Sequence, residues 1–442
     1  MSESQNNIAW EKIFDKYHIL ERIASEGKFV IKSETINKYR QARLMTKFDH
    51  KFQLPNLFVN DHLSILPISR GEYIIAPMNT FCEFNNNINV DIKDISIPPY
   101  LESLDYVNIT SEAMAINCAY VSGVISDFTA DTALFPTVNG RMSSSSFKFK
   151  VESSVVKNTY LDINVNNSQV EIDGGYEGHN FLNLIEAKNV ISSDFLIRQL
   201  YYPFRLWENK VNKRVKPLFL VYSNGIFHLR EYYFEDINCY NSIKLVKEKK
   251  YRLKDPSSSI INMQTIQELI VHTSIVDEPE VPFPQADSFE RIINLCEIID
   301  RTKDRKISKE ELSSNYDFTE KASFELRQVD YYTNAAIYLG FVSKNRGLNN
   351  LIFYSLTNRG IALFKLHISE RQIKFIEAIL EHAVFNKALN LYLQEANKPS
   401  IATVVTIMKE SHLYNVGSMS TFERRASTVM SWLDWIINLI EE

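Results

Sequence analysis

The sequence predicts an α/β core with a mixed sheet, preceded by an N-terminal mixed helical module and followed by a C-terminal α-rich region. The core is indicated by its order of elements: a helix over 109–128, strands over 146–151, 169–174 and 181–187, a helix over 193–207, and strands over 217–222 and 226–233. The last two strands flank Asn224 and Gly225, a pair typical of tight β-hairpins. With 442 residues, 45% of them hydrophobic, the chain is long enough for two or three folded units.

The first core helix is expected because Ile116 and Val121 are compatible with one buried face, and Thr110 or Ser111 can cap its first turn. Residues 1–50 have a mostly helical pattern. Residues 52–100 hold short apolar runs interrupted by five prolines, which predicts loops and short strands.

Residues 255–286 are the strongest candidate for a linker between folded units, because they open with Asp-Pro and three serines and close on a segment with three prolines and four acids. We therefore expect an N-terminal module over 1–105 that can take part in DNA recognition, a core over 106–254, and the linker over 255–286. A C-terminal unit over 287–368 and a helical unit over 369–442 complete the division.

The region after the linker has a winged-helix layout, with helices over 288–302, from 308 onward and over 324–339, then strands over 340–344 and 351–356. Ser308 and Glu311 form a capping-box pattern at the second helix, and Gly340 ends the third.

The formal charge of -5 argues at first against a polyanion as partner, but the charge is unevenly distributed. Residues 52–195 sum to -10, and residues 196–255 sum to +7. Either these regions neutralise each other in the fold, or an acidic metal pocket lies beside a basic DNA surface. Four dispersed cysteines without a CxxC pair argue against a disulfide framework or a zinc site, and no 18-residue apolar stretch occurs. We expect a cytoplasmic protein without a membrane segment.

The segment 169–188 carries the residue types most typical of catalysis. Asp173 precedes Gly174 and Gly175, which predicts a turn, and Glu186 and Lys188 share one face of the following strand. If the two strands are adjacent, two carboxylates and an ammonium group converge. Carboxylate oxygens suit Mg²⁺, which can lower the pKa of a bound water, and a lysine can offset phosphate charge. These are groups suited to hydrolysing a phosphodiester bond.

The same pattern has a simpler interpretation, since Glu-x-Lys on a strand is commonly a solvated pair. Three features favour catalysis: the acid and glycine pair upstream, the apolar Leu182 and Leu184 of a core strand, and the polar Gln199 and Tyr202 on the next helix.

Asp173 with Glu186, Ala187 and Lys188 resembles the motif of the PD-(D/E)XK nuclease superfamily, with Ile172 in the place of the proline that gives the motif its name. The resemblance implies the αβββαβ core of that superfamily, with Asp173 and Glu186 as ligands of Mg²⁺ and Lys188 as a catalytic residue.

The resemblance also implies a further acid on the first core helix, for which Glu112 is the choice, while Glu171 and Glu177 remain alternatives. Gln199, on the helix after the motif, joins the expected catalytic set.

The whole chain resembles one group of bacterial type II restriction endonucleases, through residues 36–50, 63–73, 139–149, 197–207, 219–232, 281–292 and 423–436. This implies sequence-specific cleavage of double-stranded DNA, a homodimer at least on DNA, and a cognate DNA methyltransferase in the same system without stable contact. A modification-dependent DNA endonuclease and a non-enzymatic winged-helix DNA-binding regulator remain alternatives. The recognition sequence, the cut position, the number of metal ions and the module that reads the bases stay open.

Duplex DNA is bound largely through its phosphates, so local basic surfaces are needed. Candidate DNA-binding residues lie in four places: the N-terminal module, a turn before residue 146, the segment after the helix over 193–207, and the third C-terminal helix with its wing. In each place the basic residues could instead be solvated or contact protein. The expected DNA contacts are Arg40, Arg43, Lys47, Arg141, Lys213, Arg214, Arg327, Gln328, Asn334 and Arg346.

Overall fold

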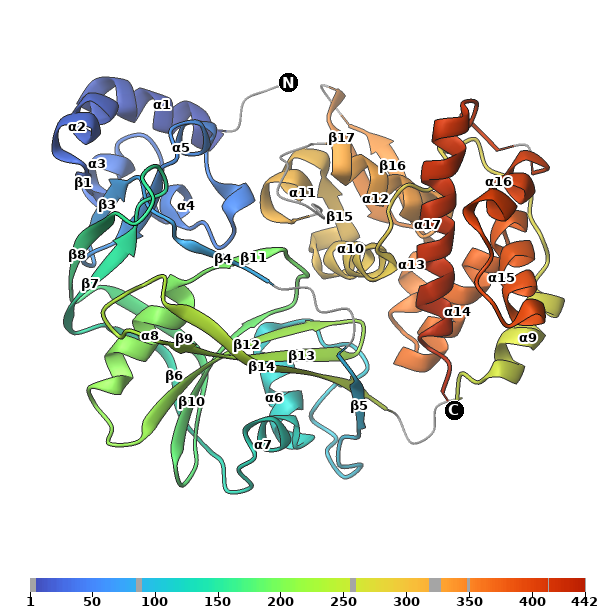
Figure 1. The fold of residues 1–442 in the computed structure, drawn as a ribbon, viewed down its shortest axis with the longest axis horizontal. Coiled ribbons are helices and arrows are strands. Elements are labelled where there is room, and N and C mark those ends of the chain that lie inside the picture. The colour runs from blue at the N-terminus through green and yellow to red at the C-terminus, as the bar shows by residue number, and fades with distance from the viewer. Residues whose placement is uncertain are drawn as a thin grey trace.

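The protein is described by a computed structural model, which covers residues 5–84, 90–254, 260–317, 327–347, 350–411 and 413–441. Figure 1 shows an N-terminal module in blue, a central sheet with its helices in cyan and green, and a C-terminal helical region in yellow to red. None of the described helices combines the length and the apolar character that crossing a bilayer requires.

The N-terminal module packs short helices around a three-stranded sheet with the order β1-β3-β2. Its core surrounds the fully buried Trp10, whose indole N–H donates to the carbonyl of Met45 at 3.0 Å, and Phe14 and Phe58 contact the same indole ring edge-on. The elements are α1 (Gln5–Tyr17), α2 (Ile19–Glu26), β1 (Phe29–Lys32), α3 (Ser33–Asn37), α4 (Ala42–Thr46), α5 (Asn56–Asn60), β2 (Ser64–Pro67), β3 (Glu72–Ala76) and β4 (Phe81–Glu83).

The central part is built on a seven-stranded mixed sheet with the order β5-β14-β13-β12-β10-β9-β6. The pairs β10–β12 and β14–β5 are parallel, and the other neighbours are antiparallel. The mixed α/β class expected from the sequence is therefore present. The elements are β5 (Ile92–Ile95), α6 (Glu112–Val121), α7 (Val124–Thr129), β6 (Phe135–Ser143), β7 (Ser146–Glu152), β8 (Tyr160–Asn166), β9 (Gln169–Glu177), β10 (Phe181–Lys188), β11 (Asp194–Leu196), α8 (Arg198–Glu208), β12 (Arg214–Ser223), β13 (Ile226–Phe234) and β14 (Ile243–Leu253).

Strand β10 is buried on both faces, as a central strand with a parallel neighbour must be. Leu182 and Leu184 belong to the core that also includes α8, whereas Ile185 and Ala187 belong to the core that includes α6 and α7. Helices therefore cover the two faces of this strand, and the polar side chains at its carboxyl end lie between them.

Two details of the predicted core are wrong. The strand predicted over 146–151 is β7, which pairs with β8 in a separate two-stranded sheet, and β6 takes the expected place in the main sheet. Strand β6 has the sequence FPTVNGRMS with mostly exposed side chains, so its proline and Asn-Gly pair resemble a loop; an edge strand tolerates both. Gly174 and Gly175 are not a turn either, because they pair with Ile185 and Leu184 inside the sheet.

The glycines serve close packing instead of chain reversal. A Cβ on Gly175 would lie 2.6 Å from Cβ of Val138 on β6, too close for any side chain. The predicted hairpin is present between β12 and β13, where Asn224 and Gly225 have φ of 50° and 73°, the left-handed values that such a two-residue turn requires. The first core helix is also present, with Ser111 as its cap, but divides into α6 and α7 at Gly123.

The C-terminal region joins helices to a three-stranded sheet with the order β15-β17-β16. The predicted helices and both predicted strands are present, and Ser308 caps its helix by accepting from the N–H of Glu311 at 3.0 Å; residues 324–326 of the third predicted helix lie outside the described residues. The elements are α9 (Met263–His272), α10 (Phe289–Arg301), β15 (Lys306–Ser308), α11 (Lys309–Asn315), α12 (Arg327–Tyr338), β16 (Val342–Arg346), β17 (Ile352–Leu356), α13 (Asn358–Leu363), α14 (Ile368–Leu380), α15 (Ala383–Glu395), α16 (Ile401–Lys409) and α17 (Met419–Ile437).

The segment 255–286 is not an open linker throughout. It contains α9, and its Phe283 and Ala286 are buried in the C-terminal core, where the indole N–H of Trp432 donates to the carbonyl of Ala286 at 2.8 Å. The residues 255–259 lie outside the described part of the chain. Buried side chains from 287–368 and from 369–442 form one continuous core, so these two stretches pack as one body.

Candidate active site

Asp173 and Glu186 lie side by side on neighbouring antiparallel strands. Gly174 of β9 pairs with Ile185 of β10, which places Asp173 beside Glu186. The backbone N–H of Ala187 donates to Oδ2 of Asp173 at 2.9 Å. The structure therefore brings the two predicted carboxylates together at the carboxyl end of β10.

Lys188 and Gln199 both donate to the same carboxylate oxygen. The Lys188 ammonium lies 2.6 Å, and the Gln199 amide 2.5 Å, from Oε1 of Glu186. Glu186 is 8% exposed, so these contacts hold its carboxylate in one orientation within a largely dry site. Gln199 reaches the site from the first turn of α8, which packs against the face of β10 that carries Glu186.

Of the three alternatives for a further acid, two approach the motif: Glu112 lies near Lys188, and Glu171 lines a small pocket together with Glu186 and Gln199. Glu112 begins α6, and its Oε1 lies 3.9 Å from Nζ of Lys188. Glu171 instead pairs with Arg141 at 3.1 Å, and Glu177 pairs with Lys213 at 2.6 Å. Glu177 therefore has its partner away from the site, whereas Glu171 pairs with Arg141 at the rim of the pocket that it shares with Glu186.

Burial and a concentration of acids perturb the electrostatics of the site. Burial raises the pKa of Glu186 to about 8; the charge of Lys188 opposes this rise, and the nearby Asp173 and Asp49 add to it. Burial alone would lower the pKa of Lys188, but Glu186, Asp49 and Glu112 outweigh it and raise that pKa. Burial also raises the pKa of Glu112, against the influence of Lys188. Lysine therefore stays charged while the buried glutamate binds a proton more readily than usual.

The N-terminal module contributes an acid that the sequence interpretation missed. Burial would raise the pKa of Asp49, but nearby positive charges, chiefly those of Lys188 and Lys47, together outweigh burial. The pKa is therefore lowered and the carboxylate stays ionised. Nζ of Lys47 lies 3.6 Å from Oδ2 of Asp49. One sequence feature pointed to this region, because Lys47 and Asp49 lie in the stretch 36–50 that carried part of the family resemblance.

The chemistry of these donors fits a divalent cation. Four carboxylates, from Asp49, Glu112, Asp173 and Glu186, interact with the charge of Lys188 or with one another. Mg²⁺ prefers such hard oxygens and is held by one or two carboxylates together with waters and substrate phosphates. Within the described ranges, no three His, Cys, Asp or Glu side chains form a ready ligand set by themselves.

The segment 189–197, between β10 and α8, is held by both flanking parts of the chain. The carbonyl of Asp49 accepts from the N–H of Leu196 at 2.9 Å, and β11 pairs with β4. From the other side, the carboxylate of Asp317 accepts from the backbone N–H and the hydroxyl of Ser193 at 2.8 and 2.6 Å. The loop that separates Lys188 from Gln199 is thus a junction of all three parts.

The basic residues that follow α8 do not lie at this site. Strands β10 and β12 run parallel, with Arg214 opposite Phe181 and Val221 opposite Lys188. The strand rises ~3.3 Å per residue, so Arg214 lies roughly 23 Å along the sheet from the level of Lys188. Lys213, at the same end, donates to Glu177 and to the carbonyl of Gly178.

The N-terminal basic residues do not share one helical face. Arg40 lies between α3 and α4, Arg43 is exposed on α4, and Lys47 follows that helix beside Asp49. The helical spacing of these three residues in the sequence suggests one common face, but the chain breaks into two short helices at this point, so no such face forms. Arg141 lies inside strand β6 and not at a turn.

In the C-terminal region, Gln328 and Asn334 are half-buried on α12, and Arg346 is exposed at the end of β16. The side chain of Arg327, the first residue of α12, lies outside what the structure describes. The buried face of α12 is formed by Val329 and Tyr332, so Gln328 and Asn334 belong to its more polar side.

Three family models match separate parts of the chain. Domain of unknown function (DUF6996) matches residues 7–75, Domain of unknown function (DUF6997) matches residues 76–252, and Domain of unknown function (DUF7226) matches residues 291–441. No match was found among curated proteins or among solved structures. The chain is therefore similar to three domain families, whose limits follow the N-terminal module, the central sheet and the C-terminal region.

Proposed function

We propose that this protein is a Mg²⁺-dependent endonuclease that hydrolyses phosphodiester bonds at specific sites in double-stranded DNA, as type II restriction endonucleases do. The observation that carries the proposal is the convergence of Asp173, Glu186 and Lys188 at one strand end, with Glu112 and Gln199 beside them. A solvated surface pair would not be buried and hydrogen-bonded in this way.

The order of elements supports the PD-(D/E)XK part of the proposal. Helix α6 precedes β6, β9 and β10, α8 follows, and β12 pairs parallel with β10. This is an αβββαβ order in which the β7–β8 hairpin is an insertion. The motif residues lie on the second and third strands of that series, β9 and β10, which supports the proposal.

The side chains have distinct parts in the proposed reaction. Mg²⁺, when bound, lowers the pKa of a water and offsets charge on a phosphate oxygen; Asp173 and Glu186 are the residues that would hold it. Lys188, kept charged by the surrounding acids, can orient a water and stabilise negative charge at the phosphate. Gln199 fixes the orientation of Glu186 through its amide. Glu112 stays near enough to Lys188 to restrain its ammonium group.

Cleavage of defined DNA tests the proposal. The protein is incubated with unmethylated phage DNA and Mg²⁺, beside Asp173→Asn, Glu186→Gln and Lys188→Met, with Glu177→Gln on the same strand as the matched control. Discrete fragments from the native protein and the control, but not from the three variants, support it. Fragments from methylated DNA alone would favour a modification-dependent enzyme. Retention of DNA without cutting would favour a regulator and refute hydrolysis.

The remaining parts of the proposal concern partners. One site cuts one strand, so cutting both calls for two copies, at least while bound to DNA. Exposed basic side chains on the described surface, such as those of Arg43 and Arg346, are available to contact DNA phosphates. A methyltransferase of matching specificity would protect the DNA of the same bacterial cytoplasm. Sedimentation of the protein with and without an uncleaved DNA site measures whether two copies associate on DNA.

A further inference from the structure

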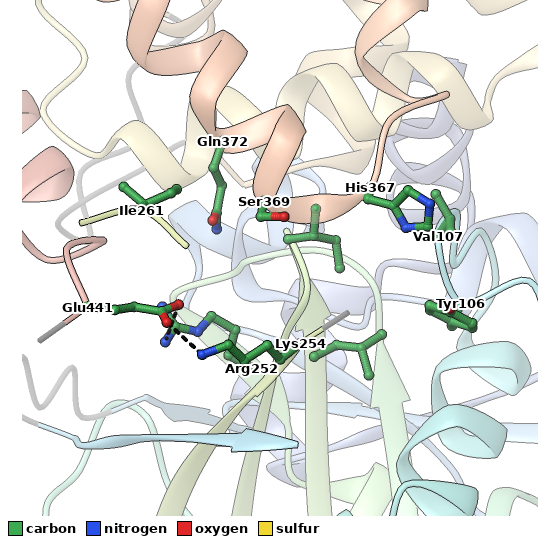
Figure 2. A pocket seen from close by; sticks show the side chains of 11 residues that line it. Tyr106, Val107, Arg252, Lys254, Ile261, His367, Ser369, Gln372 and Glu441 are labelled. Carbon is green, nitrogen blue, oxygen red and sulfur yellow. Dashed lines mark hydrogen bonds and ion pairs between the residues drawn. The ribbon is translucent and has the colours of Figure 1, made fainter. Parts of the chain in front are cut away.

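A second pocket lies where the end of β14 faces the first turn of α14, and it shares no residue with the candidate active site (Figure 2). Arg252 and Lys254 come from the sheet, and Ser369 and Gln372 come from the helix. Val107, from the segment before α6, closes one side. The pocket thus lies between the central sheet and the C-terminal helical region.

Two polar groups of the pocket lack a partner. Gln372 is 3% exposed, and its amide nitrogen makes no hydrogen bond; the buried hydroxyl oxygen of Ser369 also makes none. Figure 2 shows both side chains directed from α14 toward the pocket. A buried N–H without an acceptor is costly, and each such group calls for an explanation such as an absent ion or ligand.

The first turn of α14 adds further donors. The helix has 13 residues, and the side chain of its N-cap residue His367 makes no capping hydrogen bond to its first turn. Uncapped N–H groups and the helix dipole make such an end attractive to anions. Ser369 and Gln372 lie three residues apart, on one side of this same turn.

The opposite wall is basic and already holds a carboxylate. Glu441 receives Nζ of Lys254 at 2.6 Å and the guanidinium of Arg252 at 3.2 Å. Asp94 pairs with the same two cations at 3.4 and 2.7 Å. Arg252 and Lys254 are therefore each paired with two carboxylates, of which Glu441 lines the pocket. Glu441 satisfies neither Ser369 nor Gln372.

We propose that this pocket binds the phosphate group of a small ligand. The unpaired amide N–H, the hydroxyl, the helix N-terminus and the two cations can all donate to a tetrahedral oxyanion, and Glu441 is the lining carboxylate with which it would compete. The phosphate takes its oxygens to Gln372, Ser369 and the helix end, and shares Lys254 with Glu441. Because its donors come from two parts of the chain, the ligand ties the C-terminal region to the central sheet.

Thermal unfolding and calorimetry with inorganic phosphate, against chloride at equal ionic strength, test this site. The native protein should bind phosphate saturably with a rise in Tm. Gln372→Leu should weaken binding about tenfold or more, the loss of one hydrogen bond to a charged group. Its Tm without phosphate should stay equal or rise, because an unsatisfied donor is removed. Gln264→Leu, on exposed α9, is the matched control and should bind like the native protein.

A second variant keeps the test decisive if Gln372→Leu does not fold. Lys254→Met leaves the helix intact and should also weaken phosphate binding. Adenosine 5′-monophosphate and a short DNA duplex with or without a 5′-phosphate identify the source of the phosphate group, since tighter binding of the nucleotide points to a small molecule. No saturable binding to the native protein, tighter binding of the phosphorylated duplex than of the nucleotide, or equal binding by Gln372→Leu and Lys254→Met would overturn the proposal.

Discussion

Replacing Glu186 by glutamine should change how the stability of the metal-free protein depends on pH. Burial holds the pKa of Glu186 at about 8, against an ordinary value of 4.5. Between these values the folded protein keeps a proton that the unfolded chain has lost, so stability falls as pH rises through this window. Below 4.5 and above 8 the group adds no slope.

The magnitude follows from the same two values. Each pKa unit corresponds to about 1.4 kcal/mol of unfolding free energy. The difference between the folded and ordinary pKa of Glu186 therefore corresponds to a stability loss of roughly 5 kcal/mol if the site does not relax, and of a few kcal/mol if water enters. Glutamine has the same shape and no charge, so Glu186→Gln should remove this slope while keeping the contact with Lys188 or Gln199.

The assay is urea unfolding in EDTA at pH 5, 6, 7 and 8 for both proteins. Subtracting the variant's pH profile of unfolding free energy from that of the native protein removes the contributions of the other titrating groups. We expect the native protein to lose stability relative to the variant as pH rises, and Mg²⁺ to reduce the difference, because a cation favours the ionised carboxylate. Parallel profiles with and without Mg²⁺ would refute the account of Glu186.

Three other changes should have measurable results. Asp49→Asn should raise the Mg²⁺ concentration needed for half-maximal DNA cleavage, because it removes one of the acids that surround Lys188. It should also lower Tm at neutral pH, since the lowered pKa of Asp49 means that its ionised form stabilises the fold. An unchanged Mg²⁺ titration would exclude Asp49 from the site. Gly175→Ala should cost about 1–3 kcal/mol of unfolding free energy through overpacking, since its Cβ meets backbone and side chain of Val138, whereas Gly174→Ala meets only movable side chains and should cost less; equal effects would contradict the β6–β9 register. Asp317→Asn should lower cleavage more than DNA binding, because it disturbs the segment next to Lys188; equal losses of both would assign Asp317 to general folding.

Local patterns predicted much of the fold. Asn224 and Gly225 readily adopt the left-handed backbone that a two-residue hairpin turn requires, so their hairpin could be located from two residues. Ser111 and Ser308 could be identified as caps because capping depends on a side chain and its own next turn. The juxtaposition of Asp173 and Glu186 needed one further assumption, that consecutive strands are neighbours.

Other features depend on contacts between distant parts of the chain. The family resemblance of residues 36–50 marks the stretch that contains Asp49, but no local pattern in it indicates that this acid interacts electrostatically with Lys188. Strand β6 was missed since an edge strand has little apolar pattern, and its place was given to 146–151. Lys213 follows α8 closely in sequence, but a parallel crossover returns the chain to the far end of the sheet.

The junction at 189–197 has a consequence for engineering. A chimera that transplants only the central sheet into another chain would lose the carboxylate of Asp317 and the amide of Asn294, which accepts from the N–H of Ile191 at 3.1 Å. It would also lose the carbonyl of Asp49 that anchors Leu196. Lys188 and Gln199 would then stand at the two ends of an unanchored loop. A chimera that keeps the arrangement of Asp173, Glu186 and Lys188 therefore has to carry both flanking parts along with β9 and β10.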